Sequence, residues 1–191
     1  MSMSYHQFVE YAVSLKNHSD TIDDGWAMCE YTNALDNKVI KYLTKKEMLK
    51  RTKHLLNSDD SELESTDDSH IMCEYHILYN LSYTCPDLYF NMWRMNGKLL
   101  SLKHIWSLVH SSLKEPLIAD KWNALTQKEH PLKNVPFFTL HPCQTTHIMK
   151  LLGFSEKKDI KDNPLVAWLS TISPLVGLDM HLSYGILCKL S

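Results

Sequence analysis

Residues 70–83, HIMCEYHILYNLSY, carry the strongest structural signal in the chain. Apolar or aromatic side chains occupy every second position of this segment, and the residues between them are mostly polar. A period of two is that of a β-strand, so the pattern predicts one long strand with one buried and one exposed face. Aromatic alternation is typical of a half-buried strand, so we expect its three tyrosines in the core: Tyr75, Tyr79 and Tyr83.

The flanking segments predict three further strands in an antiparallel meander. After a turn at Cys85-Pro86-Asp87, residues 88–95 run back and end at Asn96-Gly97, which is a strong hairpin signal. Upstream, the patterns of residues 26–31 and 38–43 predict two short strands. Together these segments predict a four-stranded sheet.

Helices are predicted on both sides of this meander. Ser4 and Gln7 form a capping-box pattern that opens an N-terminal helix. Three later helices are predicted: an amphipathic one over 102–113, one capped by Thr145-Thr146 and running through Leu152, and one from Asn163-Pro164 to Pro174. We therefore expect an α+β fold, with helices at the ends and on one face of a four-stranded antiparallel sheet.

The composition is that of an ordinary globular protein. Of the 191 residues 44% are hydrophobic and 22% are charged, and the formal net charge is −2. This charge argues against nucleic-acid binding, and five widely spaced cysteines imply no disulfide framework, which fits a reducing cytosol. No apolar stretch approaches the ~20 residues of a membrane span, so we expect no stable membrane insertion. We expect one intracellular, soluble domain over residues 1–191.

Two polar segments lie between the second and third predicted strands. Residues 45–56 are charged and are compatible with either a helix or an extended segment. Residues 58–69 are almost wholly acidic or hydroxylated and lack the regular spacing of a calcium loop. We expect residues 58–69 to form an acidic mobile loop.

Metal and cofactor sites are not expected. His70, Cys73 and His76 have metal-binding side chains, but on a strand Cys73 faces away from the two histidines. A zinc site needs several converging ligands, which this geometry does not provide. The chain has only five glycines and no glycine-rich phosphate loop, so no nucleotide cofactor is expected either.

The best candidate for a reactive group is Cys143, in Phe137-Phe-Thr-Leu-His-Pro-Cys-Gln-Thr145. Pro142 stiffens the bend that holds this thiol, and the predicted cap at Thr145-Thr146 places it near a helix N-terminus, where the dipole favours a thiolate. The alternative is a small buried hydrophobic residue, as many free cysteines are. His147 lies four residues on, but Cys143 is predicted to precede the helix, which makes a Cys143–His147 pair doubtful.

The His141-Pro142-Cys143 turn after a Phe-Phe-x-Leu strand resembles the autophagy E2-type conjugating enzymes. Further motifs of residues 70–185 strengthen this resemblance, whereas residues 1–60 match only in general plan. These motifs are Tyr75-His-Ile-Leu-Tyr79, Leu102-Lys-His-Ile-Trp106, Gln127-Lys-Glu-His-Pro131, Trp168-Leu-Ser170 and Pro174-Leu-Val-Gly-Leu178.

The resemblance implies a ubiquitin-conjugating-enzyme-like fold with family-specific additions, and a cytoplasmic transferase acting in autophagosome formation. Cys143 would accept a ubiquitin-like modifier, autophagy-related protein twelve, from the activating enzyme, autophagy-related protein seven. The modifier would then pass from this thioester to a lysine of the acceptor, autophagy-related protein five, with no separate ligase.

One departure concerns the oxyanion of that reaction. Ordinary ubiquitin-conjugating enzymes carry a His-Pro-Asn motif upstream of the cysteine, and here Leu132 follows His130-Pro131. Asn134, His141 or a tyrosine of the central strand could replace the missing amide. Two alternatives also stay open: a cysteine hydrolase using Cys143 with His141 or His147, and an inactive conjugating-fold scaffold.

Overall fold

The structure is a computed structural model that describes residues 3–50, 70–108, 125–141 and 163–188. Three predictions lie outside these ranges: the acidic segment 58–69, the bend at Cys143 and the helix through Leu152. The helix predicted over 102–113 is described as far as Leu108, with side chains to Ile105. None of the helices in the described ranges combines the length and apolar character that crossing a bilayer requires.

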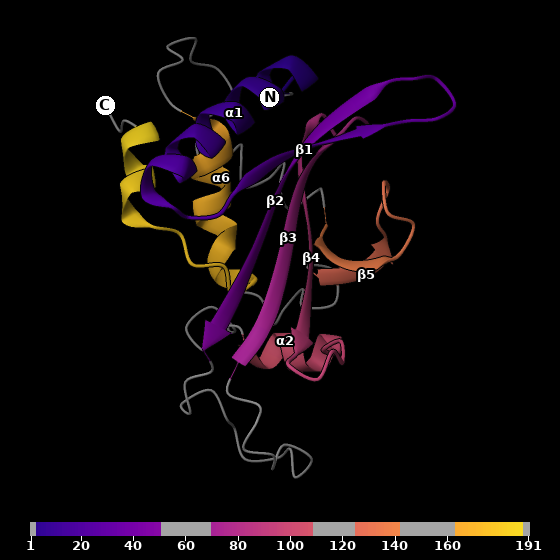
Figure 1. The fold of residues 1–191 in the computed structure, drawn as a ribbon, viewed down its shortest axis with the longest axis vertical. Helices are drawn as coiled ribbons and strands as arrows, with labels where there is room; N and C mark the ends of the chain where they lie inside the picture. The colour runs from indigo at the N-terminus through magenta and orange to yellow at the C-terminus, as the bar shows by residue number, and fades with distance from the viewer. Residues whose placement is uncertain (1–2, 51–69, 109–124, 142–162, 189–191) are drawn as a thin grey trace.

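In the described residues, one antiparallel sheet has six strands in the order β1-β2-β3-β4-β6-β5 (Figure 1). Their bounds are β1 Ala27–Thr32, β2 Val39–Lys50, β3 His70–Asn80, β4 Cys85–Arg94, β5 Leu125–Glu129 and β6 Pro136–Leu140. The predicted meander β1–β4 is confirmed, but the predicted count of four strands is wrong. The strand β5 escapes detection because a single buried apolar residue, Leu125, gives it no clear alternation.

Two helices cover one face of the sheet, and a third lies beside the end of β4 (Figure 1). The former are α1 (Tyr5–Ile22) and α6 (Pro164–Ile172), and the latter is α2 (Leu102–Leu108). The capping box at Ser4 and Gln7 and the Asn163 cap are both present as predicted. Two 3₁₀ segments, η2 (Ser173–Leu175) and η3 (Leu182–Leu187), complete the described elements.

The main core lies between these helices and the face of the sheet that we call the inner face. On β3, the alternate residues Ile71, Cys73, Tyr75 and Ile77 are buried there, as the sequence pattern predicts. The Tyr75 hydroxyl donates a hydrogen bond to the Val176 carbonyl oxygen at 3.0 Å, so this buried phenol is satisfied. The central strand is thereby fixed to the segment that follows α6.

The opposite face, called the outer face below, is also buried over β3 and β4, and the prediction of an exposed face is wrong. Leu78, Tyr89 and Phe137 form a second apolar cluster there, with Leu132 packed against it. Phe137 and Leu132 belong to the β5–β6 hairpin, which therefore covers this face. Because this hairpin lies far along the chain from β3 and β4, the local sequence of these strands does not show that their outer face is covered.

The β3–β4 turn lies at residues 81–84 and not at Cys85-Pro86-Asp87, which belong to β4. Asn80 starts it, because its side-chain oxygen accepts the backbone N–H groups of Ser82 and Tyr83. Pro86 is tolerated in the strand because the described pairs of β4 with β6 are at Tyr89 and Phe90, beyond it. Tyr83 is consequently a half-exposed turn residue, not the core residue that the alternation predicts.

Two remaining predictions are confirmed. Residues 45–50 continue β2, which confirms the extended alternative for that part of the charged segment. Asn96-Gly97 forms the turn after β4, with Gly97 at φ 82 and its N–H donating to the Arg94 carbonyl oxygen at 2.9 Å.

Candidate active site

The candidate site begins where β6 ends. On β6, Phe138 and Leu140 belong to the main core and Phe137 to the outer-face cluster, so the strand is anchored on both faces. His141 follows the strand, and its ring lies 6.4 Å from the ring of Tyr83 in the β3–β4 turn, centroid to centroid. Cys143 lies outside the described residues. In the sequence it stands two residues after His141.

Asn134 lies at the other end of β6, in the turn that joins it to β5. It adopts a left-handed conformation with φ 53, and its N–H donates to the His130 carbonyl oxygen at 2.9 Å. Asparagine is among the few residues that accept this conformation readily, so the turn alone accounts for its presence. The rise of β6 is ~13 Å, which makes His141 the better placed of the two candidates as a neighbour of Cys143.

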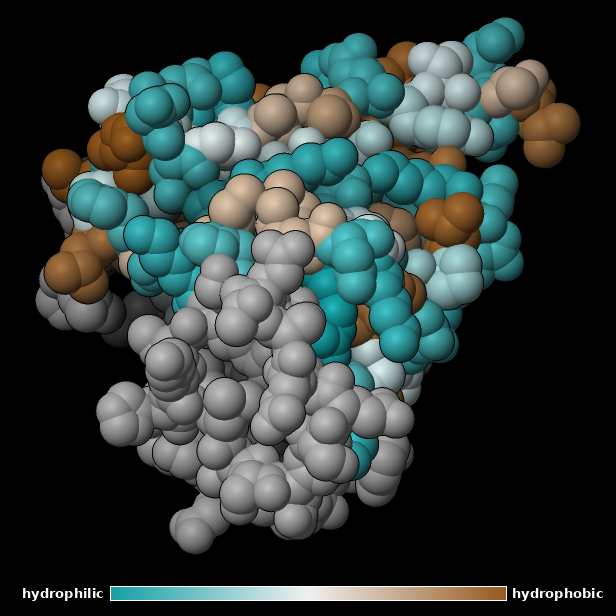
Figure 2. Space-filling model, turned by 60° about the horizontal axis from the view of Figure 1, so that its bottom comes forward, coloured by the Kyte–Doolittle hydropathy of each residue, from teal (hydrophilic) through white to brown (hydrophobic). Residues whose placement is uncertain are grey.

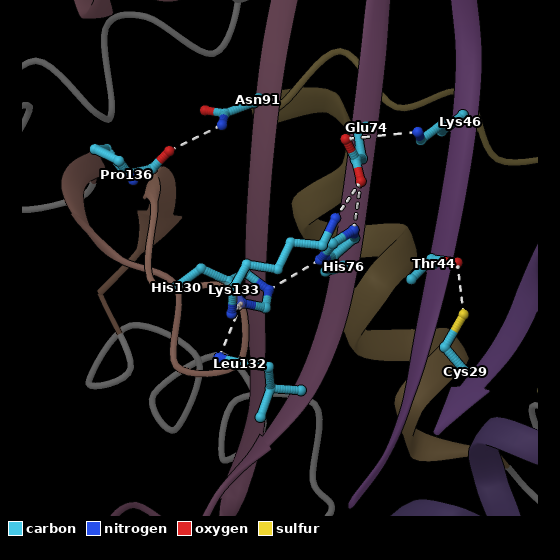
Figure 3. A network of polar contacts seen from close by, with 10 residues as sticks. All are labelled: Cys29, Thr44, Lys46, Glu74, His76, Asn91, His130, Leu132, Lys133 and Pro136. Atoms are coloured by element: carbon cyan, nitrogen blue, oxygen red, sulfur yellow. Dashed lines mark hydrogen bonds and ion pairs between the residues drawn. The ribbon is translucent and has the colours of Figure 1, made fainter. Parts of the chain in front are cut away.

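A polar network on the outer face fixes the turn of this hairpin (Figure 3). His130 Nδ1 accepts the backbone N–H groups of Leu132 and Lys133, both at 3.2 Å, so the ring proton must lie on Nε2. That Nε2–H donates to His76 Nδ1 at 2.9 Å, and His76 Nε2–H donates in turn to Glu74 Oε1 at 2.8 Å. The backbone donors thus determine the tautomers of both histidines.

The network is buried at its histidines and charged at its carboxylate. Burial lowers the pKa of His130 to about 4, so its ring is neutral at pH 7. The hydrogen bond from His76, together with Lys133 Nζ at 2.8 Å from Oε1, lowers the pKa of Glu74 to about 2. A buried network in which every member has a partner specifies one arrangement, and here it holds the β5–β6 turn against β3.

No local sequence pattern predicted this network. In the sequence, His130 begins a motif that lacks asparagine, and His76 belongs to a histidine–cysteine cluster whose side chains cannot converge on a zinc ion. The only local indication was that Glu74 and His76, two residues apart on β3, have side chains on the same face. Their partner, His130, lies far along the chain. Side chains on β3 alternate as predicted, since Cys73 is on the inner face and His76 on the outer face.

The other cysteines are placed differently from a reactive thiol. Cys73 is fully buried, and burial raises its pKa to about 12, which disfavours the thiolate. Cys85 is also buried; Cys29 Sγ lies 3.4 Å from Thr44 Oγ1, and Cys188 Sγ donates to the Asn163 carbonyl oxygen at 3.6 Å. Cys143 remains the candidate nucleophile, because it follows the end of β6 in the sequence and is not one of these four cysteines.

The described antiparallel sheet and its helices form an α+β fold, the class to which the ubiquitin-conjugating type belongs. A solved structure described as "Crystal structure of Autophagic E2, Atg10" matches 94% of this chain and 99% of its own, with a TM-score of 0.52 and 20% identity. At this identity the likeness concerns the fold. It confirms the predicted fold class, apart from the two added strands.

The sequence comparisons identify the family. The chain belongs to the family described as "Autophagocytosis associated protein, active-site domain", whose model matches residues 7–183. It is 44% identical to the human ubiquitin-like-conjugating enzyme ATG10 over 116 residues, 60% of this chain and 53% of that protein. It is 39% identical to the protein of that name in Arabidopsis thaliana over 113 residues, 57% of this chain and 50% of that one. The chain matches about half the length of these curated relatives.

Proposed function

We propose that the chain is an E2-type transferase that carries a ubiquitin-like modifier as a thioester on Cys143. The observation that carries this proposal is the family match, which spans Cys143 and is described as an active-site domain. The curated relatives support it, because each is named a ubiquitin-like-conjugating enzyme. We propose that residues 1–191 form one conjugating-enzyme-like domain that works in the cytoplasm.

The proposed partners are those implied by the resemblance of the cysteine turn. Autophagy-related protein seven would load autophagy-related protein twelve onto Cys143, and a lysine of autophagy-related protein five would receive it. Thioester exchange between two thiols is nearly isoenergetic, so loading requires little beyond an accessible thiolate. An enzyme that works without a ligase must itself hold the acceptor.

The transfer to lysine is the harder step. A free lysine with a pKa of ~10.4 is deprotonated in only about one molecule in a few thousand at pH 7, so the protein must desolvate and orient the amine. Attack on the thioester also places negative charge on its carbonyl oxygen, where one aimed donor is worth ~3–4 kcal/mol. We propose His141 and the Tyr83 hydroxyl as the side chains that meet these two requirements, since His141 stands two residues before Cys143 and the Tyr83 ring lies beside it.

The test is a charging assay with purified proteins. The chain is mixed with the activating enzyme, the modifier and ATP, and the products are run on a gel without reductant. We expect an adduct of chain plus modifier that disappears when a thiol is added. Absence of any such adduct, with the activating enzyme shown to be loaded, would contradict the proposed function.

A further inference from the structure

A buried carboxylate, Asp87, joins the β3–β4 turn to the end of β6. Asp87 lies on β4 with only 1% of its surface exposed. Its Oδ1 accepts a hydrogen bond from Thr139 Oγ1 at 3.0 Å, and Thr139 stands two residues before His141. Its Oδ2 accepts from three further donors: Asn80 Nδ2 at 3.1 Å, the Tyr89 hydroxyl at 3.2 Å and Lys128 Nζ at 3.3 Å. A buried carboxylate with four hydrogen-bond donors has a well-defined position, and it ties together the elements that supply those donors.

Asn80 connects the Asp87 carboxylate to the β3–β4 turn. Its side-chain amide donates to Asp87, while its side-chain oxygen accepts the N–H of Ser82 at 3.0 Å and the N–H of Tyr83 at 3.1 Å. One rigid amide group therefore sets both the shape of the turn and its position relative to β6. Tyr83, whose ring lies beside that of His141, is thus held in place by Asn80 through its backbone N–H.

The far side of the turn is held as well. Thr84 has a φ of 50, which is uncommon for a β-branched residue. Its carbonyl oxygen accepts the N–H of Met3 at 2.9 Å, and Met3 is buried. An unfavourable backbone conformation persists where tertiary contacts over-determine it, so this turn is built into one position.

We propose that Asn80 and Asp87 are positioning residues, which hold Tyr83 against His141 and so set the geometry of amine attack at Cys143. This inference rests on the proposed function. Loading should depend on it little, because thiol exchange asks mainly for an accessible thiolate. Transfer to an amine should depend on it strongly, because that step relies on orientation.

The test uses Asn80→Asp with Asn96→Asp as its matched control. Asn80→Asp keeps the oxygen that accepts the turn N–H groups but replaces the donor to Asp87 by a second carboxylate. Asn96 Oδ1 accepts the Lys98 N–H at 3.0 Å in the turn after β4, so Asn96→Asp makes the same change in a turn without this carboxylate. Single-turnover discharge of the loaded thioester is measured with free L-lysine and with the acceptor protein.

For Asn80→Asp we expect loading within about threefold of the unchanged chain and a maximal discharge rate lowered about tenfold, with the half-saturating acceptor concentration unchanged. Asn96→Asp should match the unchanged chain in all three quantities. The defect relative to the unchanged chain should shrink between pH 8 and pH 6, because the introduced carboxyl group can donate to Asp87 again once it is protonated. Loss of stability alone would not give this pH profile.

A second variant tests the other arm of the network. Thr139→Val removes the hydroxyl that donates to Asp87 and keeps the shape of a fully buried side chain. If both variants act through Asp87, the double variant should be no slower than the slower single variant. Independent, multiplying effects on discharge would overturn the inference.

The position of the turn is also read without any reaction. In NMR spectra the ring signals of His141 should shift in Asn80→Asp and stay in place in Asn96→Asp, since the Tyr83 ring would move away. Unshifted signals and normal lysine discharge would overturn the inference while leaving the proposed function intact. If the unchanged chain formed no adduct, the proposed function would fail, and the NMR shift would still decide whether Asn80 sets this turn.

Discussion

Individual cysteines differ sharply in their ability to act as nucleophiles. Cys73 is sealed in the main core with its pKa raised by burial, while Cys143 follows a strand end that carries a histidine beside a half-exposed turn tyrosine. A nucleophile must reach its partner's thioester, which a fully buried side chain cannot do. This contrast gives the first prediction.

We predict that Cys143 alone forms the adduct with the modifier. Cys143→Ser should give a slower-forming oxyester that survives reductant, because an alkoxide is a poorer leaving group than a thiolate. Cys143→Ala should give no adduct, whereas Cys73→Ala should load normally if it folds. The measurement is the charging gel with and without reductant, and an adduct persisting in Cys143→Ala would refute the assignment.

The buried histidine His130 makes stability depend on pH. In the unfolded chain its pKa returns to about 6.5, while in the folded chain it is about 4, so between these values the unfolded state binds more protons. The contribution of the neutral His130 ring to the free energy of unfolding is therefore complete above pH 6.5 and decreases as the pH falls towards 4. Glu74, whose pKa is lowered to about 2, adds a loss only as the pH falls through about 4.5 and below.

We predict that His130 contributes a loss of about 2 kcal/mol in unfolding free energy between pH 7 and pH 5. Urea titrations at both pH values measure it. His130→Asn should lower stability at pH 7 and flatten this dependence. His6→Asn, at an exposed position of α1, is the control and should keep the slope of the unchanged chain. An equal slope in His130→Asn would show that other groups cause the acid sensitivity.

At the scale of elements, β1 is an edge strand of the described sheet. Among the described residues β1 pairs with β2 alone. The N–H of Lys41 on β2 donates to the Tyr5 hydroxyl at 2.8 Å instead of to β1, so Lys41 and its partner Glu30 form a pair without backbone bonds. The N–H and C=O of Glu30 therefore point to the open edge. Exposed apolar or aromatic residues lie in the same hairpin: Leu35 in its turn, and Tyr31 and Val39 on its two strands. Figure 2 shows hydrophobic (brown) atoms at the outermost point on the upper right of the molecule.

We predict that the acceptor protein adds a strand to this edge. Glu30→Pro removes one outward donor without breaking the β1–β2 ladder. It should load normally and discharge normally to free lysine, yet transfer to the acceptor protein at least tenfold more slowly.

Two variants control this experiment. Glu30→Ala removes the exposed ion pair with Lys41, at 3.1 Å, and should have little effect. Ile40→Pro removes a donor of the ladder itself and should destabilise the hairpin. If the folded Glu30→Pro protein transferred the modifier normally, the edge would not be the acceptor site. It would then be a protected edge, with Lys38 and Lys41 preventing other chains from pairing with it. Recognition of the acceptor would lie elsewhere, most simply around α2.

At the scale of the whole molecule, residues 51–69 connect two strands that already meet. Lys50 at the end of β2 is paired with His70 at the start of β3, so the segment closes a hairpin. Deleting residues 58–69 shortens this connection from 19 residues to seven. The cost of closing a loop rises with the logarithm of its length, which gives a gain of about 1 kcal/mol on shortening.

We predict that this deletion leaves loading within a few-fold of normal and raises the free energy of unfolding by about 1 kcal/mol. Urea unfolding and the charging assay measure the two effects. Complete loss of loading in a folded deletion variant would mean that the acidic segment is a docking site for the activating enzyme.

Local signals were sufficient for most of the described elements of this protein, but not for the β5–β6 hairpin. Capping residues, period-two alternation and the Asn-Gly turn depend on neighbours in the chain, so the sequence predicted α1, α6, the meander β1–β4 and the turn after β4. The proline-stiffened bend that marks Cys143 as a candidate is also a local prediction, and it lies outside the described residues.

Contacts between distant segments were decided only on folding. The hairpin β5–β6 joins the sheet, buries the outer face of β3 and β4, and brings His130 to His76 and Thr139 to Asp87. Each of these pairs is separated by about 50 residues of chain, and no local pattern in either partner specifies the other. The sequence thus predicts most of the elements and a candidate nucleophile, while the surroundings of the candidate site arise from tertiary packing, because burial and hydrogen-bond partners are properties of the assembled sheet.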